Sequence, residues 1–439
     1  MRHTVTHFCR DVKQKFYRGH PEVVCVAYGS RLCLTGRVRQ ESTSSAYAAP
    51  PVSGAGELLQ LLRDETPRTR AELAKLTGLA RSTVGARVDA LLASGLLAPS
   101  GEAASTGGRP PVRFAFNPEA RVVVGADIGA THGRVALTDL SGRPICEIGE
   151  SLDITDGPEV VLDWLVATTR RLLEQAGRQP RDLIGIGIGV PGPVEHSSGR
   201  PMRPPIMPGW DGYDVPGHLH RDFDVPVLVD NDVNIMALGE HAMAHPDVEH
   251  LLFVKVATGI GAGIISGGRL HRGAVGAAGD LGHVAAPHAP EVLCSCGNVG
   301  CLEAVASGPA ISKALKEIDI LAESNSDIVD LVRGGNIPAA LAVRQAGRTI
   351  GEVLATCVSL LNPSVIVIGG SLVQAGESLI AGVREVVYGR SLPLATGVLQ
   401  IVPATTGVQA GVIGAATMVI QHALTADRVD LAIARLSAS

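Results

Sequence analysis

Hydrophobic residues between positions 54 and 118 recur at helical spacing in three segments and then alternate. Apolar positions three and four apart form one face of a helix, whereas strict alternation is typical of a half-buried strand. The pattern therefore predicts three short helices followed by a strand at Val112–Phe116. The helical faces consist of Leu58, Leu59, Leu61 and Leu62, then Leu73, Ala74 and Leu76, then Val84, Val88, Leu91 and Leu92.

Polar residues and glycines mark the ends of these helices. Thr69-Arg-Ala-Glu72 has the spacing of a capping box, which begins a helix. Gly78 permits a tight turn, and Gly95 is placed to end the third helix. Two helices joined by a short turn and followed by a hairpin predict a winged helix-turn-helix.

The third predicted helix begins with polar and cationic side chains. This part of a helix-turn-helix meets base edges in the major groove of DNA. Arg109, in Gly-Gly-Arg-Pro110, is predicted to lie along a phosphate strand or in the minor groove. A protein-interaction module with solvated charges is the alternative. The predicted contacts on the helix are Arg81, Ser82, Thr83 and Arg87.

From residue 121 onward, short apolar runs end in glycine turns. Twice a run is followed by a turn and a second strand, which predicts a duplicated α/β fold of two lobes with a cleft between them. The first such pair is Val122–Asp127 with Arg134–Asp139, and the second is Leu251–Ala257 with Ala262–Ser266. Further runs lie at Leu183–Val190, Val227–Asp230 and Val365–Gly370.

Residues 1–52 have no sustained hydrophobic period and end in a linker-like run, Glu41-Ser-Thr-Ser-Ser-Ala-Tyr-Ala-Ala-Pro-Pro51. We interpret them as disordered or as an over-long start assignment, with a short functional arm as the alternative. No apolar stretch reaches the length of a membrane span, and the first residues lack the pattern of a signal peptide. The expected location is the cytoplasm, without a membrane partner.

Charge is distributed unevenly along the chain. Residues 53–118 hold eight Lys and Arg against six Asp and Glu, whereas residues 119–439 hold twenty-two against thirty-four. Because DNA is a polyanion, only the N-terminal part is suited to approach its backbone. Aromatic residues make up 3% of the chain, so the core must consist mainly of aliphatic side chains.

Three of the eight cysteines lie close together in the sequence. Cys294, Cys296 and Cys301, with His283 eleven positions before the first, form a complete tetrahedral ligand set for Zn²⁺. The set leaves no open position for a catalytic water, so a structural zinc ion is predicted. The alternative is three reduced thiols in the core and an unrelated histidine.

Several motifs together resemble those of the ROK family, which groups bacterial sugar-responsive repressors with sugar kinases. The resemblance covers about residues 54–425, and the helix-turn-helix with Gly-Gly-Arg-Pro110 is typical of the repressor branch. The motifs are Gly282-His283, Cys294-Ser-Cys-Gly-Asn-Val-Gly-Cys-Leu-Glu303, Asp127-Ile-Gly-Ala-Thr131, Gly187-Ile-Gly-Val-Pro-Gly-Pro193, Asp230-Asn-Asp-Val-Asn234 and Thr258-Gly-Ile-Gly261.

The resemblance implies a winged helix-turn-helix followed by a two-lobed actin-like ATPase fold, which is ribonuclease H-like and sugar kinase-like. The DNA-binding domain would span residues 53–118, and the sugar-binding domain residues 119–439. Within the latter, lobe one would comprise about 119–235 plus the C-terminal return, and lobe two about 236–410. A homodimer or homotetramer is expected.

The resemblance also assigns roles to individual residues. Asn231, Asp232, Asp280, His283 and Glu303 would contact the sugar, and Asp232 would be the catalytic base in a kinase. Taken by itself, Asp-Ile-Gly could be a plain β-turn and Asn-Asp a helix cap. The two phosphate loops would consist of Asp127, Gly129 and Thr131, and of Thr258, Gly259 and Gly261.

The chain departs from the kinase pattern at several positions. Ala130, Ala257 and Ala262 stand where the kinases usually have glycine, and a Cβ there obstructs close approach of phosphate. Asp280 replaces a usual Glu, and Ile206 a common Asn. These changes leave Asp232 in place but argue against the use of ATP and Mg²⁺ and against the usual hexose pose.

We therefore predict a repressor that binds a double-stranded DNA operator under the control of a sugar or sugar phosphate. The alternative is an ATP-dependent kinase of a hexose or N-acetylhexosamine, with Asp232 as its base. A third possibility is a sugar-binding protein that neither binds DNA nor phosphorylates.

Overall fold

The computed structural model describes residues 27–28, 31–32, 54–102 and 110–438. Near the N-terminus, β1 (Ala27–Tyr28) pairs antiparallel with β2 (Arg31–Leu32). Most of residues 1–52, and Arg109, lie outside the described residues, so the expectations for them stay predictions.

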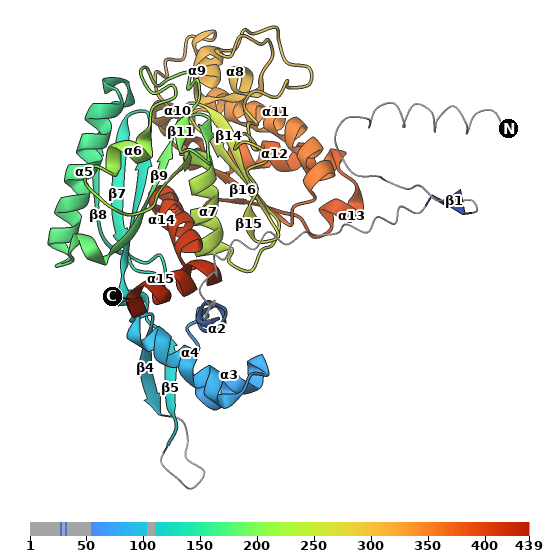
Figure 1. The fold of residues 1–439 in the computed structure, drawn as a ribbon. Helices are drawn as coiled ribbons and strands as arrows, with labels where there is room; N and C mark the ends of the chain where they lie inside the picture. The colour runs from blue at the N-terminus through green and yellow to red at the C-terminus, as the bar shows by residue number, and fades with distance from the viewer. Residues whose placement is uncertain (1–26, 29–30, 33–53, 103–109, 439) are drawn as a thin grey trace. The chain divides into compact units, whose positions relative to one another are not determined.

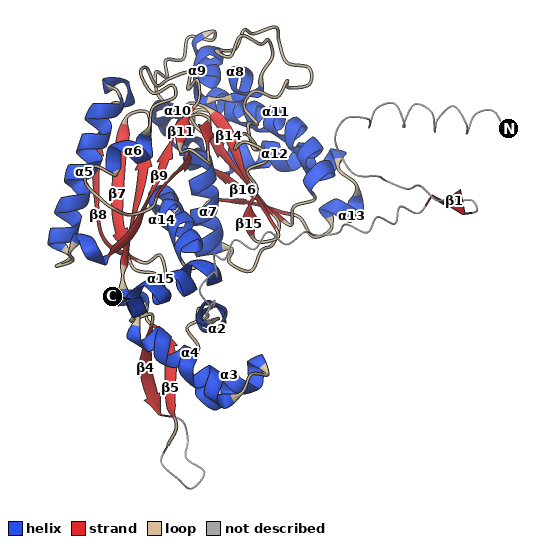
Figure 2. Cartoon of the chain, in the orientation of Figure 1, coloured by secondary structure: helices blue, strands red, loops and turns tan. Residues whose placement is uncertain are grey.

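Residues 54–116 form three helices and a small antiparallel sheet (Figures 1 and 2). The Thr69–Glu72 capping box is present, and Gly78 ends the second helix at a φ of 69°. Leu61 and Leu76, expected on buried faces, are exposed, because each points away from the shared core of this unit. The helices are α2 (Ala55–Leu62), α3 (Arg70–Thr77) and α4 (Arg81–Ala93), and the sheet order is β3 (Arg68–Thr69), β5 (Val112–Phe116), β4 (Leu97–Glu102).

Two five-stranded sheets with the same topology make up the larger part of the chain. In each, three strands form an antiparallel meander, and two more run parallel to its first strand. The first sheet has the order β12 (Val227–Asn231), β9 (Leu183–Val190), β6 (Val122–Ile128), β7 (His132–Thr138), β8 (Pro144–Ser151). The second has the matching order β17 (Gln400–Pro403), β16 (Val365–Gly369), β13 (Leu251–Val256), β14 (Ile260–Ser266), β15 (Arg269–Leu270). The predicted duplication is therefore confirmed.

Two equivalent helices, α7 (Asp232–Ala244) after β12 and α14 (Ala410–Ala423) after β17, lie side by side between the sheets (Figure 1). Their backbones approach closely at glycines. A Cβ at Gly414 would overlap the carbonyl oxygen of Ile235, and one at Gly239 would overlap that of Ala410. Larger residues at these contacts would force the helices apart.

The outer faces of the sheets are covered by further helices (Figure 2). The first sheet packs against α5 (Pro158–Gln175), and the second against α11 (Ile337–Leu361) and α12 (Glu377–Arg390). Shorter elements among the described residues include β10 (Val194–Glu195), β11 (Arg200–Pro201), α6 (Val215–Leu219), α8 (Leu302–Ala306), α9 (Gly308–Lys316), α10 (Asn325–Arg333) and α13 (Pro393–Thr396).

Helix α15 (Ala426–Ala438) contacts α2, the first helix of residues 54–116, which we call the N-terminal unit. The buried carboxylate of Asp430 accepts hydrogen bonds from the backbone N–H groups of Gly54 (3.1 Å) and Gly56 (2.9 Å). Gln60 donates to the carbonyl oxygen of Leu424 at 2.7 Å. Since α2 has no side-chain cap of its own, Asp430 supplies the acceptor that its first turn lacks.

Among the described residues, no single helix combines the length and apolar composition of a membrane span. One pair bent by 66°, Gly407–Ala423 with Ala426–Leu436, passes that test together. Most of α14, which makes up half of the pair, is buried in the protein core.

Candidate functional site

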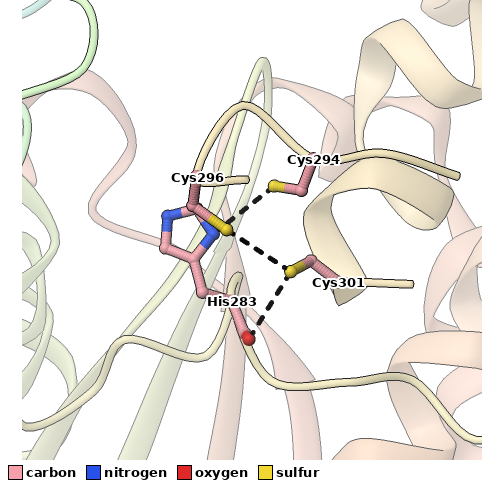
Figure 3. A group of neighbouring side chains, drawn as sticks. All are labelled: His283, Cys294, Cys296 and Cys301. Atoms are coloured by element: carbon pink, nitrogen blue, oxygen red, sulfur yellow. Dashed lines mark hydrogen bonds between the residues drawn. The ribbon is translucent and has the colours of Figure 1, made fainter. Parts of the chain in front are cut away.

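The predicted metal ligands come together on the long loop between β15 and α8 (Figure 3). One ligand atom from each of His283, Cys294, Cys296 and Cys301 lies within 4.8 Å of all the others. His283 Nδ1 is 3.6 Å from Cys294 Sγ, and the Sγ atoms of Cys296 and Cys301 are 3.7 Å apart. Four ligands about 2.0–2.3 Å from a tetrahedral ion are separated by about 3.3–3.8 Å. The cluster could therefore hold a metal ion.

The backbone and charge of this loop are consistent with such a role. Gly297 and Gly300 have φ values of 89° and 72°, which let the chain fold back between the cysteines. The N–H of Asn298 lowers the pKa of Cys296 to about 7, whereas burial raises the pKa of Cys301. Adjacent thiolates repel one another, so a bound cation would be needed to keep all three ionised.

Asn231 and Asp232 lie where β12 passes into α7. The Asn231 amide accepts from the Val233 N–H at 2.9 Å and donates to the Gly192 carbonyl at 2.9 Å. It therefore caps the helix, the alternative left open by the sequence. Asp232, with a side chain 9% exposed, accepts a hydrogen bond from Lys255 Nζ at 2.6 Å.

Lys255 is a site residue that the sequence analysis missed. Burial lowers the pKa of its ammonium, but Asp232, and after it Asp127 and Glu303, more than offset this effect and raise the pKa above its ordinary value. The group is therefore a cation surrounded by carboxylates. A lone lysine in the apolar run Leu251–Ala257 was the available signal.

Glu303 reaches the turn between β13 and β14. Its Oε2 accepts from the Ile260 N–H at 3.0 Å and lies 2.5 Å from where a Cβ of Gly259 would stand. The backbone N–H of Glu303 donates to the Gly282 carbonyl, which places the His283 segment beside this turn. Asp280 is exposed on the same loop, and Thr258 is exposed on the turn.

The turn between β6 and β7 is closed by its own residues. The Gly129 N–H donates to the His132 carbonyl at 2.8 Å, and the His132 imidazole lies where a Cβ of Gly129 would stand. The Asp127 carboxylate is 3.9 Å from that imidazole, and Thr131 is exposed. In the first turn, therefore, the N–H of a predicted phosphate-loop residue, Gly129, is bonded within the protein, and in the second the N–H of Ile260, between the predicted Gly259 and Gly261, is bonded likewise.

The predicted DNA contacts on α4 divide into two groups. Arg81, Ser82 and Thr83 are exposed at its first turn, as a base-contacting surface requires. Arg87 instead is half-buried, with its guanidinium against Gly54 at the start of α2. This placement suits a packing role for Arg87 better than a base contact.

Comparisons with known proteins agree with this architecture. The xylose repressor of Bacillus spizizenii (strain ATCC 23059 / NRRL B-14472 / W23) is 32% identical over 84% of this chain and 94% of its own length. A glucokinase of Halalkalibacterium halodurans is 29% identical over 69% of this chain and 96% of its own. The crystal structure of a ROK family transcriptional regulator, a homolog of the E. coli MLC protein, superposes with a TM-score of 0.76 at 25% identity, covering 88% of this chain and 99% of that one. Residues 123–422 match the ROK family, and the chain belongs to it.

Proposed function

We propose that this protein is a sugar-responsive repressor of transcription. The observation that carries the proposal is the extent of the matches: the xylose repressor and the solved regulator match 84% and 88% of the chain, whereas the glucokinase matches 69%. The family domain begins only at residue 123, so the longer matches include part of the N-terminal unit. A kinase would not need that unit, whereas a repressor does.

In this proposal, residues 53–118 are a winged helix-turn-helix that binds a double-stranded operator. Arg81, Ser82 and Thr83 on α4 would enter the major groove, and β4 and β5 would form the wing. A homodimer would place two such units on half-sites about 34 Å apart. Residues 119–439 would bind the sugar and alter this spacing through a shift between the two sheets.

We also propose that the His283–Cys301 cluster binds a structural Zn²⁺. Three thiolates and one imidazole suit this ion, and all four protein ligands leave no position for a reactive water. The ion would hold the loop that follows His283 next to Glu303, and so position the candidate sugar ligands on this loop.

The DNA-binding part is tested by fluorescence anisotropy with the full chain and its own promoter region. The wild type should prefer this DNA over random duplex, with affinity that falls steeply as salt rises. R81A/T83A should weaken specific binding at least about tenfold, whereas R181A, an exposed arginine before β9, should leave it unchanged. If the wild type shows no preference for its promoter, the proposal is contradicted. If R81A/T83A binds the promoter as tightly as the wild type, α4 is not the helix that contacts DNA.

A sugar kinase is the second candidate, favoured by the retained Asp232 and the glucokinase relative. An assay of ADP release across hexoses and N-acetylhexosamines decides it. Turnover that D232N abolishes would support a kinase, and turnover no higher than background would remove this candidate.

The effector is best found with a thermal-shift screen of sugars, because a ligand that binds only the folded state raises its stability. A hit added to the anisotropy assay then shows whether the sugar releases the operator or promotes its binding.

A further inference from the structure

Lys255 and Asp127 occupy equivalent positions in the duplicated fold. Each is the second-to-last residue of the first strand of its sheet's meander, and each pairs with a glycine on the adjacent parallel strand: Gly369 for Lys255, and Gly189 for Asp127. Lys255 also faces Gly261 on β14. Because neither cross-strand neighbour of Lys255 has a side chain, its long stem extends toward α7 without meeting one.

The two side chains meet the two equivalent helices. Asp127 lies against Gly411 in the first turn of α14, and Lys255 bonds to Asp232, the first residue of α7. A helix N-terminus repels a cation, so the position of Lys255 depends on the Asp232 carboxylate. The 2.6 Å ion pair joins β13 of the second sheet to the β12–α7 junction of the first.

The surroundings of this pair do not suit a phosphate group. One ammonium is balanced against the carboxylates of Asp232, Asp127 and Glu303, so the group of four carries excess negative charge. The N–H of Ile260 is already bonded to Glu303, and that of Gly129 to the His132 carbonyl. An uncharged polyol meets no such repulsion.

An ammonium group has three N–H donors. One donor of the Lys255 ammonium is directed at Asp232. A hydroxyl that donates to Asp232 would lie beside the remaining donors. The pair thus offers an acceptor and a donor side by side, the arrangement that binds two neighbouring hydroxyls of a sugar.

We propose that Lys255 determines ligand specificity: with Asp232 it binds two adjacent hydroxyls of an uncharged sugar, and the carboxylates around it exclude phosphorylated sugars. This inference rests on the proposed function, because it assumes that the site between the two sheets binds the effector. It narrows the effector from a sugar or sugar phosphate to a neutral sugar with a vicinal diol.

The first test uses isothermal titration calorimetry on the full wild-type chain. Neutral monosaccharides from the thermal-shift screen are compared with their own monophosphates. The neutral sugar should bind at least about a hundredfold more tightly, since like charges brought together in a binding site are strongly disfavoured. A monophosphate that binds as tightly as its parent sugar overturns the inference.

The second test uses K255M, which keeps the length of the side chain and removes its donors. Sugar affinity should fall about tenfold to a hundredfold, as for loss of a hydrogen bond to a charged group. K316M, an exposed lysine on α9, is the control and should bind like the wild type. K255Q retains a donor without the charge and serves if K255M does not fold; it too should lose affinity.

A panel of monodeoxy sugars separates direct contact from a structural role. The wild type should discriminate against loss of two adjacent hydroxyls, and K255M should lose discrimination at one of them only. Discrimination by K255M equal to that of the wild type overturns the inference while the repressor proposal stands, provided that the sugar still controls operator binding. Absence of sugar binding by the wild type overturns both, even if promoter binding persists.

Discussion

The two halves of the duplicated fold carry opposite charges at one equivalent position, and the comparison shows what each charge requires. Asp127 meets the start of α14, where a negative charge is favourable without further support. Lys255 meets the start of α7, where a positive charge is unfavourable unless Asp232 pairs with it. At equivalent backbone positions, the charge of Asp127 is therefore favoured by the helix that it meets, whereas the charge of Lys255 depends on its ion pair with Asp232.

The halves also differ in the segment that follows the last strand of each antiparallel meander. In the first half, β8 leads to α5 through the short turn Ile154–Asp156. In the second, the path from β15 to α8 holds the His283–Cys301 cluster instead. Local stability of the second half should therefore depend on a metal ion, whereas that of the first should not.

Metal removal is expected to have the largest effect on this comparison. C294S/C296S, or a strong chelator, should remove bound metal and cost several kcal/mol of local stability, since metal binding is coupled to the order of its loop. Hydrogen exchange should rise in residues 283–306 and stay unchanged in β6–β9. C146S, a half-buried thiol on β8, is the control. If metal removal raised hydrogen exchange equally in both halves, the expectation that only the second half depends on a metal ion would be wrong.

D232N tests the ion pair between Lys255 and Asp232. It should lower the free energy of unfolding by about 2–3 kcal/mol, because Lys255 faces a helix N-terminus and loses the one carboxylate that bonds to it directly. Urea denaturation measures the change. The double variant D232N/K255M should regain most of the loss, and a D232N cost below about 0.5 kcal/mol would mean that the pair contributes little.

G414A tests the contact between the two equivalent helices. The added Cβ overlaps the Ile235 carbonyl, so α7 and α14 must separate at a cost of about 1–3 kcal/mol. G389A on α12, where the space is open, should instead stabilise the protein by about 0.5–1 kcal/mol. If both variants melt alike in urea, the close helix contact is not important for stability.

D127N should have the smallest effect, about 0.3–1 kcal/mol, the usual contribution of a carboxylate near a helix N-terminus. Comparing the loss of unfolding free energy in D127N with that in D232N, in the same urea experiment, tests the difference between the two halves most directly. A loss at Asp127 as large as that at Asp232 would contradict it.

Local interactions were the predictable part of this molecule. The Thr69–Glu72 capping box depends on residues three apart, and the glycine-turn hairpins on adjacent strands. The cysteine cluster was predictable because three of its ligands lie within eight positions of one another.

Contacts between distant segments were not predictable. The sequence Leu-Leu-Phe-Val-Lys-Val indicates a strand, but only its position against α7 pairs Lys255 with Asp232. Nothing in the sequence near Asp430 indicates that it caps a helix 374 residues earlier. The inward turn of Arg87 likewise depends on Gly54, which precedes a different helix, α2.

The bond between Asp430 and the start of α2 has a consequence for biosynthesis. Translation produces α2 long before α15, so the first turn of α2 lacks its acceptor until Asp430 has been made. Domains usually fold in order from the N-terminus as they emerge from the ribosome. Here residues 54–116 reach their final form only after α15 has been made, and a chain truncated before α15 is expected to compete poorly for the operator.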